Sequence, residues 1–226
     1  MNFLTLILAL SASSYAVTNE SASIKIFKDS NHGDLSLIQT MINKISTDIK
    51  GDNSGLCYFV EMDPHFQDSI NKYMSKNKSY EDSFLKAWNE YVQRMNFPNA
   101  KSVLPKVLLS YLRDHGFQVF TADISKTNSD LGKETKSLIV LMEKEYSETG
   151  TYSQATWKRY VETMVIKRNQ AFAENIKKLI TQNKCKRSFF LVGNAHLRST
   201  VPNYGPAVTP LQEYLSKYGY SVIVEN

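Results

Sequence analysis

The sequence predicts an α/β fold with a mostly parallel central sheet of about five strands flanked by helices. Short runs of β-branched and aromatic residues alternate with longer stretches of helical periodicity. The short runs are almost continuously apolar, as in parallel strands that are covered on both faces. With 42% hydrophobic and 22% charged residues, the 226-residue chain has a globular composition, and no low-complexity linker divides it. We therefore expect a single domain.

The predicted strands are short and spread along the whole chain. They occupy residues 23–27, 56–61, 117–123, 188–193 and 220–225. Between the first two strands, apolar residues recur at steps of three and four, which predicts a helix with one buried stripe. We expect this helix to begin at Asp34 and to end at Gly51. Its stripe consists of Leu35, Ile38, Ile42, Ile45 and Ile49.

A helical insert is predicted over residues 64–155, around the third strand. Residues 64–114 have the periodicity of two or three helices, the last of which ends at Gly116. Residues 130–182 are helical again, with a break near Gly150.

A final helix precedes the last strand. It is predicted to have Thr209 as its N-cap and Pro210 in its first turn.

The first sixteen residues have the pattern of a secretory signal peptide. An apolar run from Phe3 to Leu10 is followed by small and polar residues that end at Ala16. Eight apolar residues are too few to span a bilayer, and no later stretch approaches membrane length. We therefore expect residues 17–226 to form the mature domain, secreted or periplasmic. Its formal charge of +5 is mild and includes no run of five basic residues, which argues against nucleic acid as a partner.

Histidine or acidic side chains, which can act in catalysis or bind a metal, follow four of the predicted strands. His32, Glu61, Asp123 and His196 come at or just after the ends of the first four strands. Ligands bind outside the carboxyl ends of parallel strands, so we expect these side chains to share one site. A single histidine or acid after a strand is usually a cap or turn residue. The prediction therefore rests on the presence of such residues at four strand ends.

A cation is predicted to join these acids. Arg168 falls within the apolar stripe of a helix, where a buried guanidinium needs a partner. It either forms a structural ion pair with Glu61 or Asp123, or holds an anion during a reaction. Asn175 lies on the same stripe and is expected to bond a backbone group. The stripe itself consists of Val161, Val165, Phe172, Ile176 and Leu179.

The other two histidines are expected to differ in role. His65 follows Pro64 near Glu61 and is predicted to line the rim of the site. His115 precedes Gly116 and is predicted to be a solvated residue at a helix C-terminus.

These residues resemble a known superfamily. The stretches SIKIFKDSNHGDLSLIQTMINKI, GLCYFVEM, KRNQAFAENIKKLI and SFFLVGNAHL are similar to the erythromycin-esterase/ChaN-like superfamily, related to the Tiki/TraB/PrgY proteins. The resemblance implies an α/β fold with one pocket formed by His32, Glu61, Arg168 and His196. The GxxH motif matches at residues 193–196, whereas Asp29 stands where the first such motif would place glycine. Members of this superfamily include proteins that look like metal-dependent peptidases, antibiotic-inactivating esterases and haem-binding lipoproteins. The resemblance therefore implies the fold more firmly than the reaction.

The predicted chemistry is hydrolysis of an amide or ester bond in a small molecule or peptide. His32, Glu61 and His196 form a sufficient ligand set for Mn, Co or Zn with an open position for water. Alternatively, without a metal, one histidine acts as general base, Glu61 either orients it or activates water, and Arg168 stabilises the oxyanion. The chain has no GxSxG, HExxH, GxxxxGK[ST] or GxGxxG motif, which argues against the common hydrolase, zincin, P-loop and dinucleotide-binding classes.

Two other functions are open. The first is an exported haem- or ligand-binding protein that uses His32, His196, Arg198 and Tyr204. The second is a degenerate family member that acts as a secreted interaction protein, as the departure at Asp29 would allow.

The two cysteines of the chain are predicted to be structural. Cys57 and Cys185 lie at the amino-terminal ends of the second and fourth strands, opposite the predicted site. If these strands are neighbours, a disulfide is feasible in an exported protein.

Overall fold

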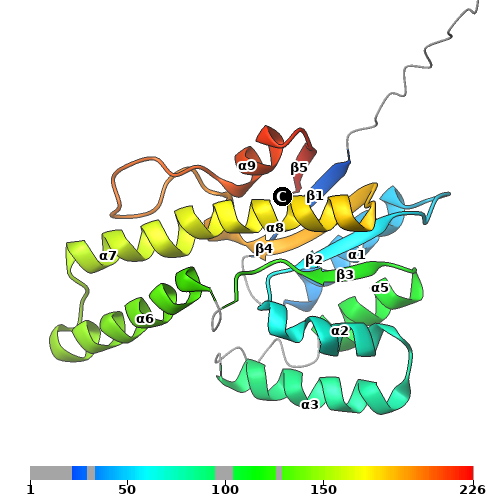
Figure 1. Cartoon of the computed structure of the whole chain (residues 1–226), viewed down its shortest axis with the longest axis horizontal. Coiled ribbons are helices and arrows are strands. Elements are labelled where there is room, and N and C mark those ends of the chain that lie inside the picture. Colours follow the sequence, from blue (N-terminus) through cyan, green and yellow to red (C-terminus); the bar gives the residue numbers. More distant parts are fainter. Residues whose placement is uncertain (1–21, 30–33, 95–103, 126–128, 226) are drawn as a thin grey trace, which may run out of the picture.

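The fold is a five-stranded parallel sheet covered by helices. The computed structural model describes residues 22–29, 34–94, 104–125 and 129–225 (Figure 1). The strand order is β3-β2-β4-β1-β5, and every pairing is parallel, which confirms the predicted fold class. The strands are β1 (Ser23–Asp29), β2 (Leu56–Val60), β3 (Gln118–Thr121), β4 (Arg187–Gly193) and β5 (Ser221–Glu225).

Helices from the first half of the chain cover one face of the sheet. Helix α1 begins after Asp34, whose carboxylate accepts hydrogen bonds from the backbone N–H groups of Ser36 and Leu37. The helix ends three residues before Gly51, and Leu35 is 53% exposed, so the buried stripe begins at Ile38 and the prediction for Leu35 was wrong. The elements on this face are α1 (Leu35–Asp48), η1 (Pro64–Phe66), α2 (Gln67–Met74), α3 (Lys78–Arg94), η2 (Leu104–Leu109) and α5 (Ser110–Asp114).

Two helices from the second half cover the other face. Helix α8 (Arg168–Asn183) buries Phe172 and Ile176 against the sheet, and α9 (Leu211–Lys217) packs beside it. The N-cap of α9 is Pro210 rather than the predicted Thr209. The backbone carbonyl of Thr209 instead accepts a hydrogen bond from the side chain of Asn169 in α8.

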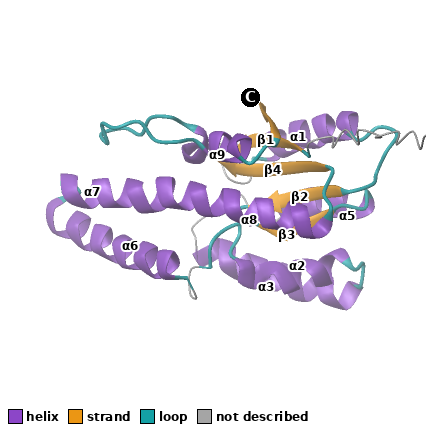
Figure 2. Cartoon of the chain, turned by 45° about the horizontal axis from the view of Figure 1, so that its top comes forward, coloured by secondary structure: helices purple, strands orange, loops and turns teal. Residues whose placement is uncertain are grey.

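A helical arm extends beyond the sheet. Helix α6 (Asp130–Thr149) ends at Gly150, which has the left-handed φ of 71° that favours glycine, and the chain turns back into α7 (Gln154–Val161). A π-helical turn, η3 (Glu162–Lys167), joins α7 directly to α8, and the three form one rod in Figures 1 and 2. Among the described helices, none is both long and apolar enough to cross a membrane.

A disulfide lies at the amino-terminal edge of the sheet. It joins Cys57 in β2 to Cys185, just before β4, with the two Cα atoms 5.7 Å apart. Because β2 and β4 are neighbours, the bond links adjacent strands at the edge opposite the carboxyl ends. The predicted signal peptide and His32 lie outside the described residues.

Candidate functional site

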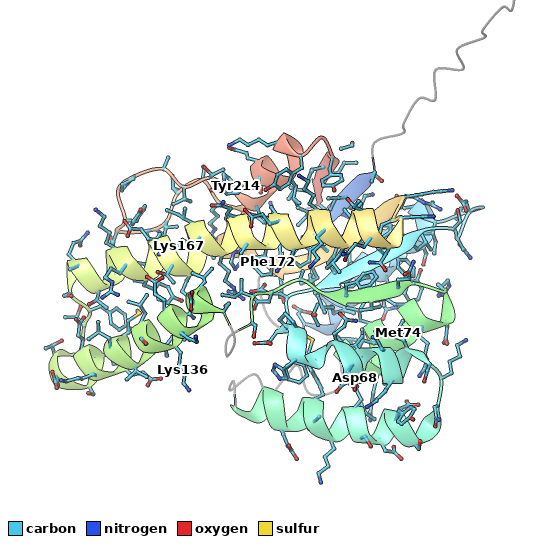
Figure 3. The ribbon with its side chains drawn as sticks, in the orientation of Figure 1. Asp68, Met74, Lys136, Lys167, Phe172 and Tyr214 are labelled. Carbon is cyan, nitrogen blue, oxygen red and sulfur yellow. A yellow bond between two sulfur atoms is a disulfide. The ribbon has the colours of Figure 1, made fainter. Side chains whose placement is uncertain are left out.

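Three of the predicted site residues meet at the carboxyl edge of the sheet. Asp123, Glu61 and His196 follow β3, β2 and β4, which are consecutive in the sheet order. The helix that covers this edge begins with Arg168, directly after the π-helical turn η3. Such turns are frequent at functional sites. Lys167 and Phe172, labelled in Figure 3, lie on either side of Arg168 in the sequence.

Arg168 binds both acids. Its Nε and Nη2 atoms donate to the two carboxylate oxygens of Asp123 at 2.8 and 2.6 Å, and Nη2 also donates to Glu61 Oε1 at 2.9 Å. The side chains of Arg168 and Asp123 are only 10% and 2% exposed. Burial alone would lower the pKa of Arg168, but the hydrogen bond to Asp123 and the two negative charges hold it above its usual range. The guanidinium is therefore a permanent charge inside the fold.

Glu61 is kept ionised. Its Oε2 accepts a hydrogen bond from the backbone N–H of Gly193 at 2.8 Å, and Oε1 lies 3.5 Å from Nε2 of His196. Burial would raise the pKa of Glu61, but His196, Arg168 and the Gly193 N–H together hold it well below its usual range. A carboxylate with so low a pKa is a weak base, so its natural role is to orient and stabilise a neighbouring cation.

The environment of His196 selects one tautomer of its ring. Asn169 donates from Nδ2 to two carbonyl oxygens, those of His196 and Thr209, at 3.2 and 3.1 Å. Carbonyls can only accept, so the Asn169 amide has one orientation, and its Oδ1 must accept from His196 Nδ1 at 2.6 Å. In the neutral ring the proton is therefore on Nδ1, and Nε2 carries a lone pair.

The lone pair of Nε2 faces the charged groups. Arg168 Nη1 lies 3.3 Å from Nε2, and the ring is edge-on to Phe172 with centroids 5.2 Å apart. A protonated His196 would face the guanidinium at this distance and would gain Glu61 Oε1 as its acceptor. This arrangement suits a base that takes a proton transiently and is stabilised by a fixed carboxylate.

Gly193 contributes its backbone to the site. Its φ of −53° is open to any residue, and a Cβ built on it would lie 3.4 Å from Glu61 Oε2 and 3.8 Å from His196 Cδ2. The glycine of the GxxH motif supplies its N–H to Glu61 where the chain turns toward His196. Asp29 is the register partner of Gly193, so these two residues lie at the same level of the sheet.

The structure does not bring the other predicted residues to this cluster. Asp29 is on the strand face of Phe27, which packs against the α1 side. Burial, together with the charge of Asp29, raises the pKa of Tyr58 on the same side of the sheet. His65 is 59% exposed and its Nδ1 lies 2.9 Å from buried Asp63.

Two further predicted residues lie on the chain beyond His196. Arg198 is exposed, and Tyr204 lines a separate groove on the arm.

His115 is the C-cap residue of α5, near the predicted helix end. Its Nδ1 lies 2.8 Å from the carbonyl oxygen of Tyr111.

The described residues include two of the three predicted metal ligands, Glu61 and His196. No group of three His, Cys, Asp or Glu side chains in the described part of the chain could hold a metal ion, and His32 lies outside that part. Glu61 and His196, the two described members of the predicted ligand set, are both in contact with Arg168. A metal ion between them would have to displace a buried guanidinium, so the arrangement fits a carboxylate held by arginine better than a metal ligand.

Two asparagines of α8 support the site. Asn175 donates to the carbonyls of Ala122 and Asp123, both at 3.3 Å, which confirms the prediction that it serves the backbone. The sequence analysis did not predict Asn169 as a site residue, because a single polar residue next to a buried arginine does not alter the hydrophobic periodicity of a helix. Its adjacency to Arg168 on the buried side of α8 was the available signal.

Comparison with known proteins supports the fold. No protein-family profile matches the sequence, and none of the curated proteins matches it. A solved structure of the erythromycin esterase EreC in its open conformation is similar, with a TM-score of 0.52 and 12% identity over 90% of this chain and 69% of that chain. A protein from Bacillus cereus has a TM-score of 0.54 and 14% identity, and the match covers 90% of this chain and 65% of that protein.

A third similar structure is the haem-binding ChaN of Campylobacter jejuni. Its TM-score is 0.47 and its identity 11%, over 91% of this chain and 81% of that chain. At these identities the structures of EreC and of the Bacillus cereus protein establish the fold alone: the chain has an erythromycin-esterase-like fold, as its sequence resemblance implies. The Tiki/TraB relation stays a prediction.

Proposed function

We propose that this protein is a hydrolase that cleaves an ester or amide bond at the cluster of Glu61, Arg168, Asn169 and His196. The observation that carries the proposal is the lone pair on His196 Nε2, which Asn169 fixes in a buried site beside a permanent anion and a permanent cation. Perturbed, buried charges at the carboxyl edge of a parallel sheet are typical of active sites.

The proposed reaction begins with water activated by His196. In the free protein Nε2 accepts a hydrogen bond from Arg168 Nη1 at 3.3 Å, and the incoming water replaces that contact. Nε2 then takes a proton from the water, the water oxygen forms a bond to the carbonyl carbon, and the carbonyl π electrons move to its oxygen. Glu61 stabilises the resulting imidazolium, because its Oε1 atom already lies 3.5 Å from Nε2 of His196. Arg168 Nη1 has a second N–H with no partner in the described part of the chain, and it is the donor for the developing oxyanion. When the tetrahedral intermediate collapses, the bond to the leaving group breaks and Nε2 returns its proton to that group.

The test is hydrolysis of a panel of p-nitrophenyl esters and peptidyl aminocoumarins. His196→Gln is expected to lower kcat/KM by about 10²- to 10⁴-fold, the usual contribution of a general base. His115→Gln is the matched control, because this histidine bonds a helix carbonyl outside the cluster. Full activity in His196→Gln, or loss of activity on chelation, would contradict this arginine-assisted mechanism.

The haem-binding alternative finds less support in the geometry. The haem-binding prediction places His196 and Tyr204 in one site, whereas His196 is buried in the cluster and Tyr204 lines a different groove. A Soret shift on titration with haem that disappears in His196→Ala would favour this alternative. A Glu61→Ala protein with full biological effect would instead favour a degenerate interaction protein.

We also propose that the protein is exported after cleavage at Ala16. The disulfide between Cys57 and Cys185 supports export, since such bonds persist mainly in oxidising compartments. N-terminal sequencing of the exported protein is expected to begin at Val17, and a mature protein that retains residues 1–16 would refute the cleavage.

A further inference from the structure

The outer side of α6 has exposed apolar residues. Within the described part of the chain this helix packs mainly on α7 and η3, and it buries Thr135 and Leu138 on that inner side. Ile139 and Val140 are turned away from it and are 41% and 58% exposed. Figures 1 and 2 show α6 on the arm, beyond the sheet. The outer side of α6 is therefore accessible to a second molecule.

Two charged residues on this outer side differ from the other charged residues of α6. Lys136 and Glu143 are exposed and form no ion pair within the described part of the chain. Lys136, labelled in Figure 3, points away from the rod of α7 and α8. The remaining charged residues of α6 all bond within the molecule: Lys133 with Asp130, Lys144 with Glu148, Glu134 with Lys167, and Glu145 with Ser153 and Thr156.

Lys136 and Glu143 are too far apart to pair with each other. Seven residues separate them, which is about 10 Å along the helix axis, whereas helix neighbours pair at spacings of three or four residues. Seven residues are also close to two turns, so both side chains lie on the same side of α6. Ile139 and Val140 lie at the midpoint between them. The outer side therefore has a lysine, two apolar residues and a glutamate in symmetric order.

This order is complementary to its own reverse. If two α6 helices pack antiparallel, with Ile139 of each copy opposite Val140 of the other, Lys136 of each copy lies opposite Glu143 of the other. The reason is that both charged residues lie about 5 Å from the midpoint. Two-fold symmetry produces this ion pair twice. A parallel pairing in register would place lysine against lysine and glutamate against glutamate, so the charges select the antiparallel arrangement.

The same order of charges argues against a lipid surface as the partner. A helix that lies on a membrane combines a large apolar face with lysine and arginine on its polar face. On the outer side of α6 the apolar residues are few, and they lie between a lysine and a glutamate. A second copy of the chain matches both charges, whereas an anionic surface would repel Glu143.

We propose that this protein forms a two-fold symmetric dimer in which the outer sides of two α6 helices pack antiparallel. Ile139 and Val140 form the centre of the interface, and two Lys136–Glu143 ion pairs flank it. Tyr146, which is 56% exposed, lies further along the helix and extends the apolar contact. The small apolar area predicts a weak, reversible dimer. The dimer is independent of the hydrolase proposed above, because α6 contributes no residue to the His196 cluster.

Analytical ultracentrifugation of the mature protein tests for the dimer. Over concentrations from about 1 μM to about 500 μM, the average mass is expected to rise toward twice that of the monomer. Val140→Glu is expected to stay monomeric, because it places a charge at the apolar centre. Leu35→Glu is the matched control, because Leu35 is exposed to a similar extent but lies on α1, and this variant should still dimerise. Circular dichroism of each variant checks that its helices are intact.

Charge reversal tests the pairing itself. Lys136→Glu and Glu143→Lys are each expected to weaken dimerisation about tenfold, because like charges then face each other twice. The double variant restores opposite charges and is expected to dimerise as the unmodified protein does. His196→Gln should also dimerise normally, which separates this test from that of hydrolysis.

Several results would overturn the proposal. They are a monomer at every concentration, a dimer that persists in Val140→Glu, and a double variant that dimerises no better than the single ones. Flotation with vesicles of phosphatidylcholine and phosphatidylglycerol that is lost in Val140→Glu would also overturn it, because the outer side of α6 would then bind lipid.

Discussion

Replacing Arg168 by methionine should destabilise the protein strongly. The substitution keeps much of the side-chain volume but leaves the carboxylates of Asp123 and Glu61, 2% and 21% exposed, without their shared cation. Removing one partner from a buried ion pair costs about 3–5 kcal/mol. In a protein of this size each kcal/mol shifts Tm by about 2–4 °C. The melting temperature is therefore expected to fall by roughly 6–20 °C.

The neighbouring residue provides the control for this variant. Lys167 pairs with Glu134 at 3.0 Å but is 54% exposed, and surface pairs of this kind contribute only about 0–1 kcal/mol. Urea unfolding of Arg168→Met and Lys167→Met, followed by circular dichroism at pH 7.5, gives the two free energies of unfolding. If Arg168→Met loses no more stability than Lys167→Met, the cluster is not held by buried charge.

The loss in Arg168→Met should also depend on pH. In the unmodified protein the pKa of Glu61 is depressed, so its stabilisation is present above the unfolded pKa of about 4.3 and is lost as the pH falls toward the folded pKa. Arg168→Met lacks the cation that holds the pKa of Glu61 down, so the two proteins should converge in stability as the pH falls below about 4.3. A constant difference from about pH 5 to pH 2 would refute this explanation.

Three other predictions test separate parts of the structure. Thiol titration of the denatured, unreduced protein should find no free thiol, and two reactive thiols would exclude the bond. Reduction of Cys57–Cys185 should lower the free energy of unfolding by about 2–5 kcal/mol, because the bond closes a loop across 128 residues. Asn169→Leu should lower hydrolysis and change the ¹⁵N shifts of His196 toward a mixture of tautomers; unchanged shifts would show that Asn169 does not fix the ring. Glu61→Gln should flatten the decline of stability between about pH 5 and pH 2, measured by thermal melts, and an unaltered decline would exclude Glu61 as its source.

Local patterns were sufficient to predict most of the elements. The strands were recognisable because β2 and β4 are apolar on both faces and β1 buries Ile24 and Ile26 on one face, and all five predicted strands are present. Asp34 and Gly150 marked the ends of helices because capping depends on one or two residues. The errors at Leu35 and Thr209 are positional, because the packing partners of a helix decide where its buried stripe and its cap begin.

The residue types at the strand ends could be predicted from the sequence, and so could the need for a partner for an arginine within an apolar stripe. Which of these groups meet depends on the three-dimensional packing. The strand order β3-β2-β4-β1 brings Asp123, Glu61 and His196 together although they are far apart in the sequence. Strand order and side-chain direction follow from non-local packing of the helices on the sheet, which no local periodicity encodes. For the same reason the tautomer of His196 could be assigned only once Asn169 was seen between two carbonyls.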